Sequence, residues 1–475
     1  MTSLSSLEHV TGADRPLFFL HVPKTAGTTL IQVIEQQFDE REIARWLYPF
    51  RLVDTPADFF RRPHYFHGHV DYALMRELLP HKPVTMTVLR QPVERYLSHF
   101  GNHKRVSFEQ IPDISREVFD ALQQTTLADF VWNPSPILGT LAQYFQNLQA
   151  KLLASELSTD DLEVRNAQIR ANEYVLPTPG LADALARLDQ ELAFVGLTER
   201  FQESLFLMAY TFGWFPATEY KNFNTAQPRP QQGALPADLL QEIGRLNALD
   251  QQLYEHGRAL FDARYTQMQH ELLERYGDRE HAHASLPLVP ETVAALLDKH
   301  YQQRFKDRNP LVSTIKLSFD QKMPGSHWHL PEQHPVHGVV RWTGPGRCAH
   351  LDFPLAASTP VWLRFSLALA ITPETLASLE IKVNGEMLDV ALESADSQAQ
   401  HYKAYVSKDV LARQPGCVRV SFEVEKTLRP VDVVIAGSED QRLLGVALSE
   451  VAIEPVQEQG GVYQKFKQMV RRLMK

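Results

Sequence analysis

A short segment near the start of the chain gathers a lysine, a glycine and several threonines directly after an apolar run. The segment is 23–29, and the run 16–22 before it is typical of a buried strand. Helical spacing of apolar residues begins at Leu30, so strand, tight loop and helix are expected in that order. Backbone N–H groups at a helix start favour anions, and a lysine adds a point charge. The segment therefore predicts an anion cradle made of Lys24, Thr25, Ala26, Gly27, Thr28 and Thr29.

The order of residues in this segment differs from that of ATP-binding phosphate loops. Those loops follow G-x-x-x-x-G-K-[ST], whereas Lys24 precedes Gly27 in this chain. An ordinary ATP site is therefore not indicated. A plain helix start capped by threonine is the alternative interpretation of the same residues.

A second strand-like run, 84–89, is followed by a helix that carries basic and hydroxyl side chains. A proline early in that helix suits its first turn, and the apolar stripe leaves Arg90 and Ser98 for chemistry. A guanidinium at the strand end and a hydroxyl two turns along the helix would meet at one phosphate. Arg95, on the same helix, is expected to be solvated or salt-bridged if it has no such role.

Two histidines, His67 and His69, lie one residue apart in an aromatic segment between these two runs. In an extended backbone both imidazoles would point to the same side. A neutral imidazole can take a proton from an alcohol near neutral pH. A metal site would need further ligands, and none has recognisable spacing nearby, so no metal is expected. Histidines hydrogen-bonded to the backbone are the alternative interpretation.

The stretches FLHVPKTAGTTL and LRQPVERYLSHF closely resemble two motifs of sulfotransferases that use 3′-phosphoadenosine 5′-phosphosulfate (PAPS). These are the 5′-phosphosulfate loop and the 3′-phosphate motif. The chain looks most similar to the carbohydrate group with the heparan sulfate 2-O- and 6-O-sulfotransferases, which carry a histidine between the two motifs. Segment 67–72 has elements of their H-G-H and H-x-D-W patterns. Similarity extends over roughly residues 15–226, including 144–151, 194–201, Gly213-Trp214 and Asn222 or Asn224.

This resemblance implies a mechanism and a role for each matching residue. PAPS would be the co-substrate, held by the cradle at its 5′-phosphosulfate and by Arg90 and Ser98 at its 3′-phosphate. His69, with His67 as its close neighbour, would take the proton of the acceptor hydroxyl, and Lys24 would stabilise the leaving oxygen. The acceptor would be a carbohydrate, either a polysaccharide or a glycolipid, and no motif identifies the sugar. A P-loop-like kinase and a non-catalytic glycan-binding protein stay open as alternatives.

Composition restricts the partners and the location. The net charge of −9 over 475 residues argues against a general nucleic-acid binder. The sequence contains no uncharged apolar run of about 18 residues, so no transmembrane helix is expected. The first residues do not resemble a signal peptide. A bacterial-type, cytoplasmic relative of the family is therefore expected. The tail 457–475 is basic with one apolar helical face, which predicts peripheral contact with the inner membrane surface or a docking tail.

The periodicity predicts an α/β sulfotransferase domain over 1–276, with a P-loop-like parallel sheet flanked by helices. One long helix is expected over 236–276. A linker and a further helix would occupy 277–311. The oligomeric state stays open.

Beyond residue 312 the pattern changes to short alternating runs separated by turns. This texture, with an Asn384-Gly385 hairpin signal, predicts an accessory β-sandwich over 312–456. Three tryptophans there are either glycan-stacking residues or core residues, namely Trp328, Trp342 and Trp362. Cys348 and Cys417 are expected to be free thiols rather than a disulfide.

Overall fold

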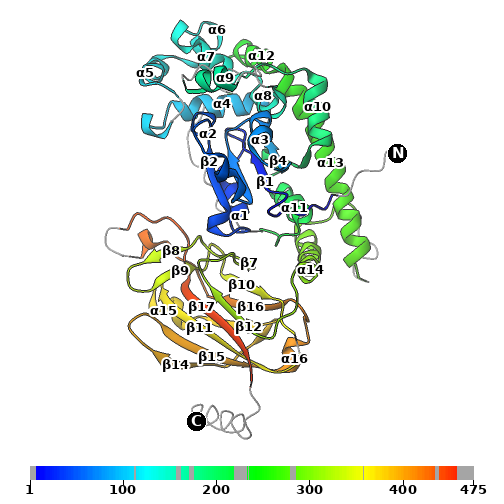
Figure 1. Cartoon of the computed structure of the whole chain (residues 1–475), viewed down its shortest axis with the longest axis vertical. Helices are drawn as coiled ribbons and strands as arrows, with labels where there is room; N and C mark the ends of the chain where they lie inside the picture. Colours follow the sequence, from blue (N-terminus) through cyan, green and yellow to red (C-terminus); the bar gives the residue numbers. More distant parts are fainter. Residues whose placement is uncertain are drawn as a thin grey trace. The chain divides into compact units, whose positions relative to one another are not determined.

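The chain forms two compact units, Met1–Arg304 and Phe305–Lys475 (Figure 1). Buried hydrophobic residues in the described part of the chain form two clusters in the first unit and one in the second. The structure is a computed structural model that describes residues 7–111, 114–156, 162–170, 176–218, 233, 235–278, 285–356, 358–433 and 438–456. The domain boundaries predicted at 276 and 311 stay predictions.

The first unit is built on a five-stranded sheet in which every pairing is parallel. Its strand order is β2-β3-β1-β4-β5. The strands are β1 (Leu17–Leu20), β2 (Ile43–Leu47), β3 (Tyr65–Gly68), β4 (Val84–Leu89) and β5 (Leu192–Leu197). The three central strands are buried throughout, as expected for a parallel sheet covered on both faces. The predicted α/β class, with a parallel sheet flanked by helices, is confirmed.

The helices of this unit follow or precede the strands in sequence. They are α1 (Gly27–Glu35), α2 (Pro49–Leu52), α3 (Tyr72–Leu78), α4 (Pro92–His103), α5 (Arg116–Gln124), α6 (Leu127–Trp132), α7 (Gly139–Phe145), α8 (Leu148–Ala154), α9 (Leu162–Arg170), α10 (Leu181–Gln190), α11 (Phe201–Phe212), α12 (Ala237–Leu246), α13 (Ala248–Tyr276) and the larger part of α14 (Pro290–Arg308), whose last turn belongs to the second unit. Helices α10, α11 and α13 pack against β5. Apolar residues of α14 enter the same core, namely Val293, Leu296 and Leu297.

The prediction of one helix over 236–276 is wrong, because α12 and α13 are separate helices that meet at Asn247. Asn247 leaves the helical conformation, with φ −116° and ψ 29°, and its side chain bonds both to Ile243 O and to the backbone N–H of Asn147. Strand β2 lies in a stretch in which the sequence pattern predicts no strand.

The second unit consists of two antiparallel sheets with the orders β13-β12-β16-β10-β7 and β14-β15-β11-β17-β9-β8, and β6 pairs with β17. Its elements are β6 (Ile315–Ser318), β7 (Gly325–Ser326), β8 (Glu332–His334), β9 (Gly338–Trp342), β10 (Cys348–Phe353), β11 (Val361–Ala370), α15 (Pro373–Ala377), β12 (Glu380–Val383), β13 (Glu386–Met387), β14 (Val390–Ala395), β15 (Gln400–Val406), α16 (Lys408–Leu411), β16 (Val418–Glu423) and β17 (Val446–Pro455). Residues of both sheets share one core. The Asn384-Gly385 turn joins β12 to β13 with positive φ at both residues, as a two-residue hairpin requires.

The tryptophans and cysteines of this unit have different environments. Trp328 is a core residue, 1% exposed, and its indole N–H donates to His350 O at 2.9 Å, so it is not available for glycan stacking. Trp342 and Trp362 are half-buried. Cys348 and Cys417 are both free thiols, as predicted.

No helix in the described parts of the chain is long and apolar enough to cross a membrane. The membrane contact predicted for 457–475 lies outside the described residues.

The second core predicts a large cost for one substitution. Phe422 is fully buried and its ring lies 5.5 Å from that of Phe365 in the other sheet and 5.7 Å from that of Trp328. Phe422→Ala should lower the free energy of unfolding by about 3–5 kcal/mol in urea titrations. The exposed residue Val431→Ala is the control, and a comparable loss there would contradict this account of the core.

Candidate active site

The loop between β1 and α1 has strained backbone at two residues that are not glycine. Lys24 and Ala26 have left-handed conformations, with φ of 72° and 63°. Each costs on the order of 1–2 kcal/mol, so the surrounding structure must impose it. Ala26 is the N-cap of α1, and its methyl side chain makes no capping hydrogen bond. The side chain before α1 therefore does not occupy the helix start, which fits an anion cradle.

Gly27, the first residue of α1, is needed for a reason that the sequence did not suggest. A Cβ atom at this position would lie 1.9 Å from Nε2 of His21. The imidazole of His21, which is 5% exposed, thus packs directly on the glycine backbone. By its place in the sequence Gly27 belongs to the predicted anion cradle, and the group that a side chain at this position would meet is the His21 ring.

The threonines of the cradle differ in their surroundings. Thr25 is fully buried and donates its hydroxyl to Val22 O at 2.9 Å, so it stabilises the loop itself. Thr28 is exposed and Thr29 is buried. Of the three hydroxyls predicted to contact a ligand, only that of Thr28 is exposed.

Lys24 is held in a cationic environment. Its Nζ donates to Asn102 Oδ1 on α4 at 2.8 Å. Burial, with the charges of Arg105 and Arg90, lowers the pKa of Lys24 to about 8. At neutral pH the ammonium is still mostly protonated, and it lies in a positive potential that an anion would relieve.

Arg90 connects the end of β4 to the loop. Its guanidinium donates to the carbonyl oxygen of Lys24 at 2.9 Å and lies 3.5 Å from the Glu94 carboxylate. The side-chain amide of Gln149 makes two hydrogen bonds to the backbone of Arg90. It accepts from the Arg90 N–H and donates to the Arg90 carbonyl oxygen, both at 2.9 Å. Arg90 and Ser98 are 9% and 8% exposed, so both retain limited access.

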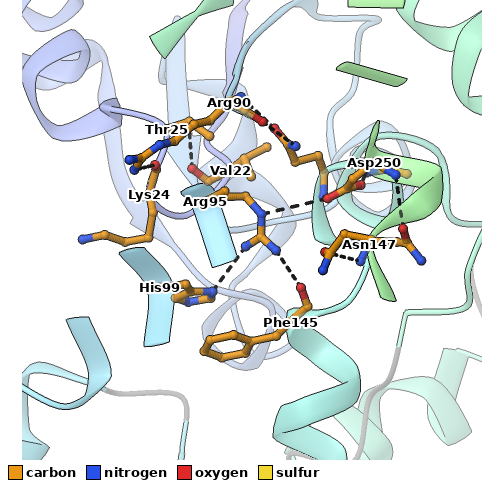
Figure 2. A network of polar contacts seen from close by, with 12 residues as sticks. Val22, Lys24, Thr25, Arg90, Arg95, His99, Phe145, Asn147 and Asp250 are labelled. Carbon is orange, nitrogen blue, oxygen red and sulfur yellow. Dashed lines mark hydrogen bonds and ion pairs between the residues drawn. The ribbon is translucent and has the colours of Figure 1, made fainter. Parts of the chain in front are cut away.

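Beneath Arg90, the first turns of α8 and α13 cap each other (Figure 2). Asp250 of α13 accepts from the backbone N–H groups of Gln149 and Ala150, at 3.1 and 2.8 Å. In return Asn147, which precedes α8, accepts through Oδ1 from the N–H groups of Leu249 and Asp250, at 3.0 and 3.1 Å. Side-chain oxygens at helix starts are the standard partners of such N–H groups, and here each helix supplies them to the other.

Arg95 completes this network from α4 and is not solvated. It is 0% exposed, donates to Phe145 O at 2.6 Å, and its Nε lies 3.9 Å from Asp250 Oδ2. Of the two expectations for Arg95, the solvated one is therefore wrong and the salt-bridged one is confirmed. Burial raises the pKa of Asp250, whereas Arg95 and the two N–H groups lower it.

The predicted histidines, His67 in β3 and His69 just after it, form a cluster with His21, which directly follows β1. The His69 ring lies 4.7 Å from that of His21, and Nε2 of His69 is buried with no hydrogen-bond partner among the described residues. Burial, with the nearby charges of His67 and Lys24, lowers the pKa of His69 to about 4. His69 is therefore a neutral imidazole at physiological pH, next to the lysine of the cradle.

His67 occupies a more enclosed position than His69. It is 0% exposed, and its Nε2 lies 3.2 Å from Glu35 Oε1, which Arg45 also binds at 2.7 Å. This geometry suits a residue that positions the neighbouring imidazoles and does not itself contact a ligand. No group of three or more potential ligands in the described part of the chain is arranged to hold a metal ion.

The structure thus brings together Lys24 with Arg90, and His69 with His21. Sequence reasoning missed His21, Asn102, Gln149 and Asp250. Two of these lay in stretches that the resemblance had already covered: His21 precedes the cradle, and Gln149 falls within 144–151. Asn102 and Asp250 carried no signal, because their partners are distant in the sequence.

Comparison with known proteins supports the resemblance at a coarse level. No protein-family profile matches the chain. Galactose-3-O-sulfotransferase 3 from Bos taurus is 26% identical over 260 residues, which cover 51% of this chain and 56% of the relative. Heparan-sulfate 6-O-sulfotransferase 3-B from Danio rerio is 28% identical over 297 residues, which cover 53% of this chain and 65% of the relative. Both are carbohydrate sulfotransferases.

The chain spans less than two thirds of the length of these relatives. Among solved structures, a GH115 4-O-methyl-alpha-glucuronidase matches with 11% identity and a TM-score of 0.20. The match covers 62% of this chain and 45% of that chain. A score this low carries no information about the fold.

The network beneath Arg90 predicts the effect of removing its carboxylate. Asp250→Ala removes the only charged partner that the buried Arg95 guanidinium has among the described residues, although the guanidinium keeps its hydrogen bond to Phe145 O. It also leaves two backbone N–H groups without their acceptor. Chemical denaturation should show a loss of about 3–5 kcal/mol. Asp262→Ala is the matched control, because Asp262 pairs with Arg200 at the surface with 54% of its side chain exposed, and should cost less than about 1 kcal/mol. Equal losses in the two variants would refute the structural role of Asp250.

Proposed function

We propose that the chain transfers the sulfuryl group of PAPS to a hydroxyl of a carbohydrate acceptor. The observation that carries this proposal is the bond of 2.9 Å from the Arg90 guanidinium to the Lys24 carbonyl. It places two cationic residues and the N-terminus of α1 together at the carboxyl ends of β1 and β4. In open parallel sheets this edge is where ligands bind. The likeness to two carbohydrate sulfotransferases supports the same reaction.

The residues present fit a nucleotide with two separate anionic groups. The N–H groups of α1 and the exposed Thr28 would hold the 5′-phosphosulfate. Arg90 and Ser98 would hold the 3′-phosphate, which distinguishes PAPS from ordinary nucleotides. The Ser98 hydroxyl makes no hydrogen bond within the described residues, so it can donate to such a group.

The reaction would be an in-line displacement at sulfur. The acceptor oxygen forms a bond to sulfur while the bond from sulfur to the bridging phosphate oxygen breaks, and that oxygen keeps the electron pair. His69 would accept the hydroxyl proton, and the Lys24 ammonium would stabilise the charge on the leaving oxygen. A bound polyanion would raise the pKa of both His69 and Lys24, which makes the first a better base and keeps the second protonated.

Three finer predictions belong to this proposal. The loop before α1 would act as a P-loop-like phosphosulfate loop, which the left-handed backbone of Lys24 and Ala26 and the absence of a capping bond from the Ala26 side chain support. The two C-terminal sheets would form an accessory β-sandwich, which their shared core supports. The location would be cytoplasmic, with peripheral membrane contact through 457–475.

The cofactor can be tested by calorimetric titration with 3′-phosphoadenosine 5′-phosphate, 5′-AMP and ATP. We expect a preference for the 3′-phosphorylated nucleotide that Arg90→Ala reduces by about 10- to 100-fold, with the affinity for AMP unchanged. Arg61→Ala is the control, because Arg61 is 71% exposed and its ion pair within the described residues is a long one, 3.9 Å, to the exposed Asp58. Equal binding of ATP would favour a kinase, and loss of AMP binding in Arg90→Ala would show that the residue acts through the loop instead.

The pKa of Lys24 predicts the basic limb of the pH profile. Since the ammonium is the active form and its pKa is about 8, kcat/KM for PAPS should fall above that pH. The decrease should be about tenfold per pH unit. In Lys24→Arg the charge persists, so the falling limb should disappear, although the rate at neutral pH is lower. A wild-type profile that stays flat to about pH 10 would contradict the assigned role of Lys24.

A further inference from the structure

Strand β2 contains a bulge next to the histidine cluster. It pairs with β3 at Ala44 with Phe66 and at Leu47 with Gly68, so β2 has one more residue than β3 between the pairs. The bulge contains Arg45 and Trp46, and a Cβ at Gly68 would lie 2.1 Å from Leu47 O. Bulges of this kind often redirect a side chain beside an active site.

Trp46 has a backbone conformation that a bulky residue rarely adopts. Its φ is 49°, in the left-handed region. The neighbouring Arg45 fixes the bulge by binding Glu35 at 2.7 Å and Glu40 at 2.5 Å. Such strain persists only where surrounding contacts impose it, and it concentrates at functional positions.

Two aromatic side chains, Trp46 in the bulge and Tyr48 just after β2, lie against the imidazoles. The Trp46 ring lies 5.2 Å from that of His67 and 6.1 Å from that of His21. The ring of Tyr48 lies 5.5 Å from that of His69. Trp46 is nevertheless 37% exposed, so core packing does not explain its orientation.

The chemistry of this surface suits a sugar ring. An indole face accepts the C–H face of a pyranose, and its N–H can donate to a hydroxyl. The indole N–H of Trp46 makes no hydrogen bond among the described residues. The guanidinium of Arg51, 5.6 Å from the Tyr48 ring centre, adds a cation at the same place.

We propose that Trp46 and Tyr48 form the acceptor subsite, in which a saccharide ring stacks on Trp46 and presents a hydroxyl to His69. This inference rests on the proposed function and deepens it. The bulge then orients Trp46 so that the bound acceptor hydroxyl faces His69. Neither Trp46 nor Tyr48 would contact the nucleotide.

The test separates acceptor binding from chemistry. The acceptor KM and kcat are measured with PAPS and two probes, a galactose-terminated oligosaccharide and an unsulfated heparosan oligosaccharide. Trp46→Ala should raise the acceptor KM on the order of 30-fold while kcat changes little. Trp46→Phe should restore most of the affinity. Phe59→Ala is the control, because Phe59 is 40% exposed and contacts only the Phe60 ring among the aromatic contacts described.

Other outcomes would overturn the subsite. A lower kcat at unchanged KM, or the same effect in Phe59→Ala, would do so. Failure of the proposed function is recognised separately, by absence of 3′-phosphoadenosine 5′-phosphate binding in calorimetry. In that case a glycan array still decides the subsite: binding that Trp46→Ala abolishes supports it, and an array with no bound glycan refutes it.

The strain gives an independent readout. Trp46→Gly should melt at a temperature at least as high as Trp46→Ala, because glycine adopts positive φ without strain. Both variants should lose acceptor affinity equally. A markedly lower melting temperature for the glycine variant would mean that the bulge does not hold this residue in the left-handed conformation.

Discussion

The candidate site depends on one buried carboxylate. Asp250 lies in the interior, where an unpaired charge would be costly, and it is stabilised by two backbone N–H groups and by Arg95. Those N–H groups belong to the first turn of α8, which also carries the Gln149 amide that clasps Arg90. The position of Arg90 at the end of β4 therefore depends on α8, and the start of α8 depends in turn on Asp250 of α13. This explains why α12 and α13 are separate, since a continuous helix would have no start at which to form this exchange of caps.

The electrostatics of the site favour a polyanionic ligand. Lys24 has a lowered pKa partly because two arginines lie near it, and the same lysine lowers the pKa of His21 and His69. These shifts have one cause in common, which is positive potential in a poorly solvated region. A bound anion would oppose the part of each shift that comes from neighbouring positive charge, whereas the part that comes from burial would remain. Under the proposed function, binding of an anion near Lys24 would thus raise the basicity of His69 without any movement of the backbone.

Local sequence patterns predicted the parts of the structure that depend on neighbours in the chain. The strand, loop and helix around Lys24, the strand ending at Arg90, and the Asn384-Gly385 hairpin all follow from spacing and turn chemistry. Contacts between distant segments could not be predicted in this way. The His21 ring on Gly27, the inward hydroxyl of Thr25 and the burial of Arg95 depend on tertiary packing. The bulge in β2 was missed for the same reason, because its register is defined only by β3.

Backbone strain gives an argument for the site that is independent of the resemblance. Among the described residues of the first unit, four that are not glycine have positive φ: Lys24, Ala26, Trp46 and Asn147. Two belong to the cradle, one faces the histidines, and one is part of the exchange of caps beneath Arg90. Strain of this kind is retained where function requires a fixed geometry. All four lie in one region of a unit of about 300 residues. The sheet edge, the charges and the histidines point to the same region, so the candidate site is also where the fold has to stabilise an unfavourable backbone conformation.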